Sequence, residues 1–291
     1  MKLFTEISCE KLPVFSLSEP VCVLGSCFAD AMGGRLADAG FPVLANPFGT
    51  LYNPVSVAEA VSRLDSGKPF GLEDCVPMGA GAERVCSFSH HSTFARPTAE
   101  EFLAHANARL SEDAARWRAC RHVIITLGTA WVWRALEQPG RPVVANCLKR
   151  PAREFAHEML DVEGCAAPLA SLIASHPDKR FLLSVSPIRH LGGGARANTL
   201  SKATLQLAVE RLLSGAAGEA APRVHYFPAY EILMDELRDY RFYGDDLVHP
   251  APAAVQIIWE RFLDACTDPA DRPRILAAER AARAARHHPI F

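Results

Sequence analysis

The hydrophobic residues of the chain form short continuous runs, and segments with helical spacing lie between them. Four runs stand out, at Val21–Leu24, His122–Leu127, Arg180–Val185 and Val224–Phe227. Apolar runs that do not alternate with polar residues are typical of strands covered on both faces. The 3.6-residue period of an amphipathic helix is found in Phe28–Ala39, Ser56–Leu64, Ala99–Ala119, Ala166–Ser175, Asn198–Leu213 and Ala253–Ala265.

The alternation of these strands and helices predicts the fold class. Repeated strand–helix–strand units form parallel sheets with right-handed crossovers and with helices on both faces. We therefore expect an α/β fold, a three-layer α/β/α sandwich with a mainly parallel central sheet. Ligands of such folds bind beyond the carboxyl ends of the strands. Ser26, Gly128 and Ser186 each follow a predicted strand closely, so they are expected near the site.

Two long segments, 66–98 and 131–165, have many Gly, Pro and charged residues and little periodicity. Irregular segments of this length in a compact domain are often lids or binding loops, and we expect substrate contacts there. In the first helix, Gly33 and Gly34 should each cost about 1 kcal/mol relative to Ala. Close packing of that helix on a neighbour would offset the cost.

The composition changes after residue 266. Residues 275–286 are rich in Ala and Arg, which favour a helix but supply few side chains for a core. We expect one domain over residues 1–266 and a tail over 267–291 that holds a surface or docking helix. The tail has too small an excess of positive charge for polyanion binding.

Length, charge and cysteine content limit the classes of partner and the compartment. The chain has 291 residues, of which 49% are hydrophobic, with 31 Lys and Arg against 33 Asp and Glu. This balance favours neither nucleic acid nor an anionic membrane surface, so we expect a small-molecule or carbohydrate substrate; a homo-oligomer stays open. No segment approaches the ~20 apolar residues of a membrane span, and the first ten residues lack the apolar core of a signal peptide. We expect a cytoplasmic protein whose nine cysteines are reduced thiols.

Two distant segments could together supply a catalytic triad. Ser26 lies on the turn between the first strand and the first helix, and Asp246 and His249 lie three apart just before the last helix of the domain. The order Ser, Asp, His provides a nucleophile, an orienting carboxylate and a base. The alternatives are purely structural roles: Ser26 could be a helix N-cap and Asp246 a turn-forming residue.

Neighbouring residues offer alternatives for two of these roles. Asp245 could replace Asp246 as the orienting carboxylate. Cys27 is a rival nucleophile, since a thiolate forms more readily than an alkoxide. One residue into the helix, however, its side chain is expected to turn toward the sheet and to pack as a small hydrophobe.

The segment Gly25-Ser26-Cys27-Phe28-Ala29 resembles the motif that gives the GSCFA family its name, a group similar to the SGNH/GDSL hydrolases. Further matches to the family pattern follow in order at residues 46–50, 90–92, 127–131, 144–147, 186–190 and 246–250. Two positions depart from expectation. Leu148 stands where the family has His, and Gly128-Thr129-Ala130-Trp131 replaces the Gly-x-Asn-Asp block of the SGNH hydrolases, so the usual oxyanion Asn is missing there.

The resemblance implies an SGNH hydrolase-like domain in which Ser26 attacks an ester carbonyl, His249 takes its proton and Asp246 orients His249. The expected function is hydrolysis of O-acyl groups on a carbohydrate or small metabolite through an acyl-Ser26 intermediate, with no cofactor and no metal. An O- or N-acyltransferase would use the same site and the same steps up to that intermediate. A non-catalytic module that binds an anionic ligand in the same pocket is the rival from another class.

Hydrogen-bond donors must stabilise the developing oxyanion. The backbone N–H groups of Ser26 and Gly49 are the first candidates, and Gly49 has no side chain to hinder a close approach. A third donor could be the amide of Asn146 or the hydroxyl of Thr129.

Four further residues are expected to contact the substrate: His90, His91, Arg189 and His190. Arg189 could bind a carboxylate or phosphate, and His190 could act as an alternative base. His90 and His91 are adjacent and would point to opposite faces of a strand, so they are not expected to share a metal ion.

Overall fold

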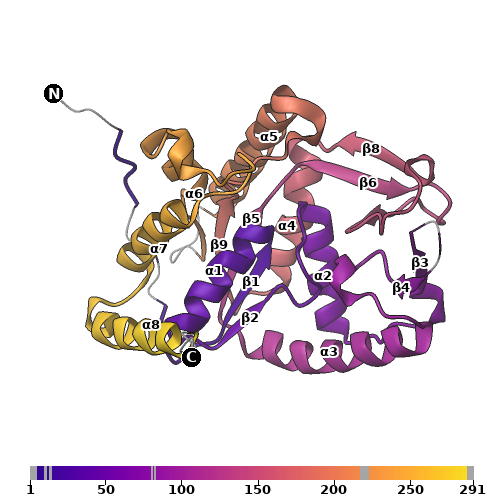
Figure 1. The fold of residues 1–291 in the computed structure, drawn as a ribbon, viewed down its shortest axis with the longest axis horizontal. Helices are drawn as coiled ribbons and strands as arrows, with labels where there is room; N and C mark the ends of the chain where they lie inside the picture. The colour runs from indigo at the N-terminus through magenta and orange to yellow at the C-terminus, as the bar shows by residue number, and fades with distance from the viewer. Residues whose placement is uncertain are drawn as a thin grey trace, which may run out of the picture.

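The computed structural model describes residues 5–9, 12, 15–79, 81, 83–216 and 223–286. Its central sheet has five parallel strands in the order β10-β9-β5-β1-β2 (Figure 1). These strands are β1 (Val21–Gly25), β2 (Val43–Ala45), β5 (His122–Leu127), β9 (Arg180–Val185) and β10 (Val224–Tyr226). The four predicted strands are confirmed, and the short edge strand β2 is the one that the sequence did not predict.

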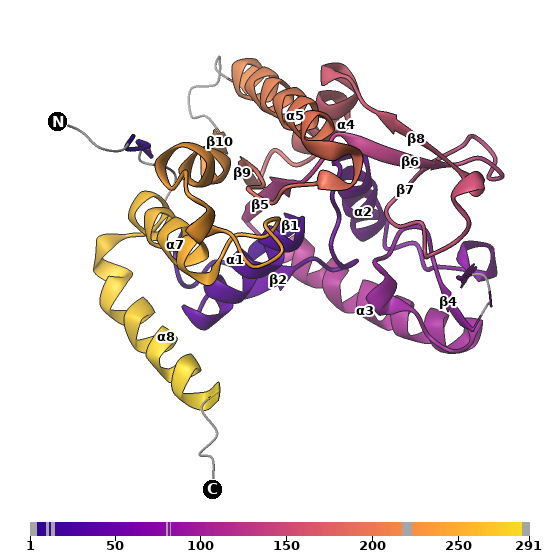
Figure 2. The same ribbon diagram turned by 45° about the horizontal axis from the view of Figure 1, so that its top comes forward.

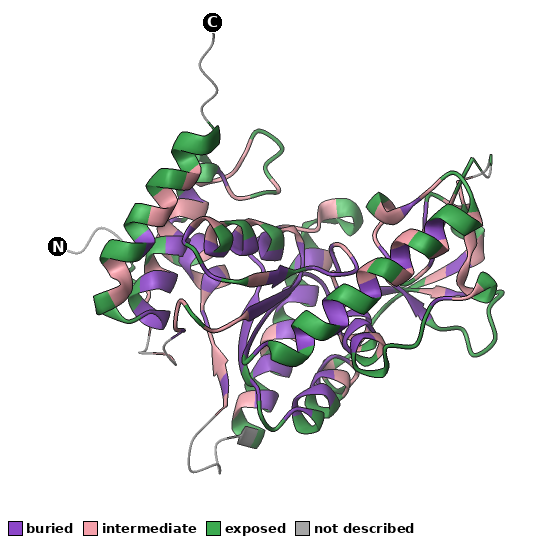
Figure 3. Ribbon diagram, turned by 90° about the horizontal axis from the view of Figure 1, so that it is seen from below, coloured by how far each residue is buried: buried purple, intermediate pink, exposed green. Residues whose placement is uncertain are grey.

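Helices cover both faces of the sheet, which confirms the three-layer α/β/α sandwich. One face packs against α1 (Cys27–Asp38), α6 (Ala229–Glu231), α7 (Pro252–Cys266) and α8 (Arg272–Arg286). The other packs against α2 (Pro54–Ser66), α3 (Ala99–Ala119), α4 (Val162–Ser175) and α5 (Gly194–Ala216). Figure 3 shows the buried strands between helices whose outer sides are exposed.

The continuous apolar runs follow from this double cover. In β1, Val21 and Val23 belong to the core on the α1 side, whereas Cys22 and Leu24 belong to the core on the α2 side. Side chains of a strand alternate between the two faces. A strand that is covered on both faces therefore favours apolar residues along its whole length.

Two small antiparallel sheets form where irregular lids were expected, so the prediction of loops was wrong for parts of both segments. Segment 66–98 contains the hairpin of β3 (Val76–Met78) and β4 (Arg84–Cys86). Segment 131–165 contains a sheet in the order β7-β6-β8, made of β6 (Trp131–Ala135), β7 (Val143–Val144) and β8 (Phe155–Met159). In Figures 1 and 2 these strands lie at the end of the molecule opposite α7 and α8. They were missed because these strands are only two to five residues long and, apart from β7, only partly buried.

The strand order locates the crevice for a ligand. Counted along the chain, the central sheet has the order 2-1-3-4-5, with β1 and β5 side by side. In doubly wound sheets of this order the connections leave the two central strands in opposite directions, and a crevice opens at their carboxyl ends. The residues that follow β1 and β5 are therefore the ones placed to line a site.

The tail helix α8 packs on α1 and α7. Its Ile275 is fully buried, and Glu279 accepts a hydrogen bond of 2.7 Å from the indole N–H of Trp259 in α7. Arg286 forms an ion pair of 2.5 Å with Asp38 at the end of α1. Residues 287–291 of the predicted tail lie outside the described residues, as do residues 1–4 and 10 of the N-terminal stretch.

All nine cysteines are free thiols. In the part of the chain that the structure describes, no helix combines the length and the apolar character needed to cross a bilayer.

The two glycines of α1 differ in their surroundings, and this generates a matched prediction. A Cβ at Gly33 would lie 2.9 Å from the Cβ of Ala45 in β2, whereas a Cβ at Gly34 would meet nothing within 4 Å. We expect Gly33→Ala to destabilise the protein by about 1–3 kcal/mol because α1 must move off the sheet. Gly34→Ala should stabilise it by up to about 1 kcal/mol, the gain in helix propensity.

Urea unfolding of the two variants and the parent protein measures both effects. If the two substitutions change the free energy of unfolding equally, the close approach of Gly33 to Ala45 is not what holds α1 on the sheet.

Candidate active site

The site begins at a turn that only glycine can make. Gly25 ends β1 with φ +133°, and a Cβ there would lie 2.1 Å from the carbonyl oxygen of Thr126 in β5. The absence of a side chain lets β1 and β5 stay in contact to their ends, because both the positive φ and the close approach exclude other residues. The chain then enters α1 with Ser26 as N-cap and Cys27 as the first helical residue.

The hydroxyl of Ser26 is directed into the protein. Ser26 has no exposed surface, and its Oγ donates to Oγ of Ser186 at 2.9 Å and accepts from the N–H of Phe28 at 3.3 Å. Its backbone N–H donates to the carbonyl of Thr126 at 3.2 Å. Among the described residues, none of the hydrogen bonds of Ser26 goes to His249. The structure thus gives Ser26 the N-cap geometry and does not bring its hydroxyl to the predicted base.

Asp246 and His249 meet as the sequence predicted. Oδ2 of Asp246 lies 2.6 Å from Nδ1 of His249, and Oδ1 accepts the N–H groups of Val248 at 2.9 Å and of His249 at 3.0 Å. These N–H groups, together with the imidazole, lower the pKa of Asp246 to about 2. The carboxylate therefore stays ionised and binds the Nδ1–H tautomer of His249, which leaves Nε2 as an acceptor. Asp246, not Asp245, makes this pair.

The free nitrogen of His249 faces Cys27. Nε2 lies 3.6 Å from Sγ of Cys27, a thiol–imidazole hydrogen bond that joins residues 222 positions apart in the sequence. The hydroxyl of Tyr52 lies 3.9 Å from the same sulfur. Burial raises the pKa of the Cys27 thiol, and the Tyr52 hydroxyl offsets part of this effect. The thiol is thus neutral at rest, with a base in contact.

Cys27 and His249 open into a pocket of ≈ 620 Å³ at the carboxyl ends of β1 and β5. One wall is the small antiparallel sheet, whose Trp131, His157 and Trp133 project from the same face. The His157 ring is stacked on both indoles, with centroid distances of 4.7 Å to Trp131 and 4.0 Å to Trp133. Segment 131–165 thus lines the pocket, as was expected of it.

Three of the other predicted site residues line the same pocket: Thr129, Arg189 and His190. Arg189 also holds the loop that carries Asp246 and His249, because its backbone N–H donates to the carbonyl of Val248 at 3.1 Å and its Nη1 to that of Leu247 at 3.2 Å. The hydroxyl of Thr129 lies 3.0 Å from that of Ser201 and accepts the N–H of Trp131 at 3.0 Å.

His190 presents an unsatisfied nitrogen. Its Nε2 is buried and has no hydrogen-bond partner among the described residues. A Cβ at Gly128 would lie 3.1 Å from this nitrogen and 3.4 Å from the Cβ of Ser26, so the nitrogen lies close behind the turn. Burial, and next the charge of Lys202, lower the pKa of His190 to about 4, so the imidazole is neutral.

The structure does not support the predicted donor roles of Gly49 and of the Ser26 backbone. The N–H of Gly49 donates to the carbonyl of Asn46 at 2.7 Å, just as that of Ser26 donates to Thr126, so neither is free. Asn146 caps a turn by accepting the N–H of Leu148 at 2.7 Å. Leu148 itself is fully buried in the core, so this departure from the family pattern lies away from the pocket.

His90 and His91 do not line the pocket, in contrast to the prediction. His90 is buried, with ring centroids 4.4–5.6 Å from four aromatic rings, those of Phe48, Phe70, Phe94 and Phe102. Its Nδ1 lies 2.7 Å from the hydroxyl of Ser87, and burial lowers its pKa to about 3. His91 caps the short 3-10 helix at 92–94. Both residues hold the fold together beside the site.

A buried lysine lies under the site and was not predicted from the sequence. Nζ of Lys202 donates to the carbonyls of Gly128 at 2.6 Å and Ser186 at 2.7 Å, which follow β5 and β9. Lys202 is 2% exposed, and burial lowers its pKa to about 7. A lysine in a helical segment ordinarily indicates a solvent-facing position, so no sequence signal marked this one.

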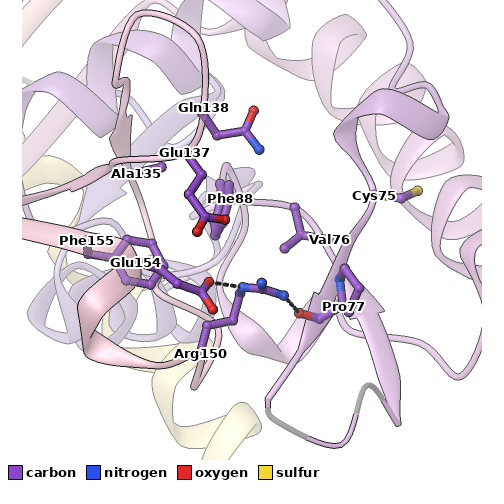
Figure 4. A pocket seen from close by; sticks show the side chains of 10 residues that line it. All are labelled: Cys75, Val76, Pro77, Phe88, Ala135, Glu137, Gln138, Arg150, Glu154 and Phe155. Carbon is purple, nitrogen blue, oxygen red and sulfur yellow. Dashed lines mark hydrogen bonds and ion pairs between the residues drawn. The ribbon is translucent and has the colours of Figure 1, made fainter.

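A separate small cavity of ≈ 160 Å³ lies between the hairpin and the β7-β6-β8 sheet (Figure 4). Arg150 crosses it, with Nε 2.5 Å from Glu154 and Nη1 donating to the carbonyl of Pro77 at 2.9 Å. These contacts tie the two small sheets together. Over the described ranges of the chain, no three His, Cys, Asp or Glu side chains are grouped to hold a metal ion.

Comparisons with known proteins found one matching family model and a similar solved structure. A family model described as the GSCFA family matches residues 20–262, most of the chain. Comparison with the curated proteins gives no match. One similar solved structure is a carbohydrate esterase family 2 enzyme with a carbohydrate binding domain from Corynascus thermopiles (Myceliophthora fergusii); the TM-score is 0.40 and the identity 15%, over 92% of this chain and 68% of that chain.

The burial of His90 predicts a pH-dependent contribution to stability. Its pKa is about 3 in the folded protein, against an ordinary value of 6.5. Between these values the unfolded chain binds a proton at this residue that the folded protein excludes, so stability falls as the pH falls. We expect His90→Phe, which keeps an aromatic ring in the cluster, to lose less stability than the parent protein from pH 7 to pH 5.

Urea unfolding of both proteins at the two pH values measures the difference. An equal loss in parent and variant would show that His90 is not excluded from protonation in the fold.

Proposed function

This chain belongs to the GSCFA family, and from the geometry of its site we propose that it cleaves or transfers acyl groups of esters through a covalent acyl-cysteine. The observation that carries the proposal is the hydrogen-bonded series Cys27–His249–Asp246, with distances of 3.6 and 2.6 Å, at the mouth of a large pocket. Nucleophile, base and orienting carboxylate in this order are the parts of a catalytic triad. The triad has the His249 and Asp246 that the sequence predicted, and Cys27 takes the place of Ser26.

Three contrasts between the adjacent residues favour Cys27 as the nucleophile. Cys27 is partly exposed and lines the pocket, whereas Ser26 has no exposed surface. The sulfur contacts Nε2 of His249, whereas the Ser26 hydroxyl binds Ser186. The Ser26 side chain also caps α1, a role that fixes the helix end from which Cys27 projects.

The first half-reaction follows from the neutral resting thiol. Nε2 of His249 takes the Sγ proton as the sulfur attacks the ester carbonyl, and Asp246 stabilises the imidazolium. The tetrahedral intermediate collapses, the carbon–oxygen ester bond breaks, and the imidazolium returns the proton to the leaving alkoxide. The products of this step are a thioester on Cys27 and a free alcohol.

Three groups are candidates to stabilise the oxyanion. The backbone N–H of Cys27 is at the first position of α1, where helix N–H groups lack an intrahelical partner and the helix dipole is positive. The Nε2 of His190, when it carries the proton of the neutral ring, is a second donor that has no other partner in the described part of the chain. Thr129 remains a candidate on the pocket wall.

The second half-reaction decides between a hydrolase and a transferase. His249 deprotonates either water or an acceptor hydroxyl or amine, which attacks the thioester, and Cys27 recovers its proton from the imidazolium. Hydrolysis releases a carboxylic acid, whereas transfer yields a new ester or amide. The hydrolysis of O-acyl groups is our first proposal, because the catalytic pair is half exposed, with side-chain exposures of 50% and 52%, and water reaches it freely.

The nucleophile assignment is tested with the variants Cys27→Ala, His249→Ala and Ser26→Ala on short-chain p-nitrophenyl esters. Loss of the nucleophile or the base should lower kcat/KM by at least about 10³-fold and about 10²–10⁴-fold respectively. Ser26→Ala should lose an N-cap, about 1 kcal/mol of stability, and keep activity within about tenfold. Circular dichroism serves as the folding control, and mass spectrometry should find the acyl group on Cys27.

The opposite pattern, an inactive Ser26→Ala beside an active Cys27→Ala, would return the nucleophile to Ser26. Full activity in both variants would refute the covalent mechanism.

The raised pKa of Cys27 predicts the pH dependence of its alkylation. The thiolate is the species that iodoacetamide attacks, so the rate at Cys27 should still be rising at pH 9. Peptide mass spectrometry separates Cys27 from the other eight cysteines. A rate that is already constant below pH 7 would show a preformed thiolate and contradict base catalysis by His249.

A further inference from the structure

A second cavity adjoins the active-site pocket on the far side of Arg189. It has a volume of ≈ 410 Å³, and Arg189 lines both spaces. The guanidinium lies 5.5 Å from the ring centroid of Tyr243, which belongs to the second cavity, and donates to the carbonyl of Leu247, within the loop that joins Asp246 to His249. The second cavity therefore lies directly beside the catalytic loop.

The lining of this second cavity differs from that of the active-site pocket. It has three tyrosines and charged groups of both signs: Tyr230, Tyr240, Tyr243, Arg238, Asp235 and Asp239. Tyr240 is 69% exposed, and its ring centroid lies 6.4 Å from that of Tyr243. The active-site pocket, in contrast, is lined by aromatic and small side chains with Arg189 as its charged residue and with no carboxylate among the described lining residues.

The wall of the second cavity is held by the core. Met234 and Asp235 lie in the π-helical segment Ile232–Glu236, in which Ile232 and Leu233 are buried. The hydroxyl of Tyr243 donates to the sulfur of Met234 at 3.1 Å. π-Helical turns are rare in proteins, and those that occur are often found at functional sites. A wall of this kind keeps its shape when the cavity is empty.

We propose that this tyrosine cavity binds the alcohol half of the ester, and that this half is a sugar ring. Aromatic faces suit the C–H faces of a sugar, and aspartate and arginine side chains suit its hydroxyl groups as acceptors and donors. The active-site pocket then holds the acyl half, and His249 in that pocket delivers the proton to the departing sugar alkoxide. The inference rests on the proposed function for the direction of the substrate, but the sugar site itself is testable without catalysis.

The kinetic test compares two acetyl esters that differ in the alcohol: p-nitrophenyl acetate and a mono-O-acetylated methyl glucoside. Tyr240→Ala removes an exposed ring, and its control is Leu72→Ala, an exposed apolar residue outside both cavities. We expect Tyr240→Ala to raise KM for the glucoside ester about 3- to 10-fold, the worth of one aromatic contact. All values for Leu72→Ala should stay within twofold, and KM changes of the same size for both esters in Tyr240→Ala would overturn the assignment of the cavity to a sugar.

A binding test separates this inference from the proposed function. Cys27→Ala is titrated with the acetylated glucoside and followed by NMR, alone and combined with Tyr240→Ala. Binding that weakens in the double variant supports the sugar site even if no ester is cleaved. Equal binding in both variants, or no binding in either, overturns the inference, whereas loss of p-nitrophenyl acetate cleavage in Cys27→Ala still supports the acyl-cysteine.

Discussion

The contact between Gly25 and Thr126 is the constraint on which the site depends. A side chain at position 25 would collide with the β5 carbonyl, so the end of β1 can lie against β5 only as glycine. The start of α1 immediately after Gly25 then gives the next two side chains different directions. The N-cap Ser26 turns inward and bonds to Ser186 and to Phe28, and Cys27, the first helical residue, is left at the surface beside His249. One backbone turn thus separates a buried, structural hydroxyl from a thiol that contacts His249.

The turn is supported from below by a buried amine, and the loop 246–249 above it is exposed. Lys202 binds the carbonyls that follow β5 and β9, so one buried side chain holds the residues after both strands. A buried polar group is tolerated only where hydrogen bonds replace its hydration, and the two carbonyls do this. The loop 246–249 has little burial of its own and is fixed by the Asp246 carboxylate and by Arg189. The conformation of this loop is therefore fixed by hydrogen bonds, because the loop has little packing of its own.

Prediction from sequence was most accurate where the burial pattern is simple. β5 and β9 were predicted with their observed bounds because both faces of each strand are covered and most of their positions are apolar. β6 and β8 were missed because Trp131, Trp133 and His157 face a pocket, and a half-exposed strand of five residues looks irregular. The position of the site followed from the strand ends, and the pairing of Asp246 with His249 from their spacing.

The sequence could not decide between adjacent residues or foresee contacts made by several distant segments. Whether Ser26 or Cys27 faces His249 depends on the backbone angles at the first turn of α1, which no side-chain pattern records. The burial of His90 among phenylalanines could not be predicted, because these neighbours come from four separate positions in the chain.

The neutral thiol of Cys27 has a consequence for the lifetime of the protein. Peroxide oxidises cysteine as the thiolate, so a site that keeps its sulfur protonated reacts slowly with oxidants. Burial raises the pKa of this thiol. In the proposed mechanism the imidazole takes the proton only as a new bond forms, so the arrangement that keeps the thiol protonated would also shield the sulfur from oxidative damage between turnovers.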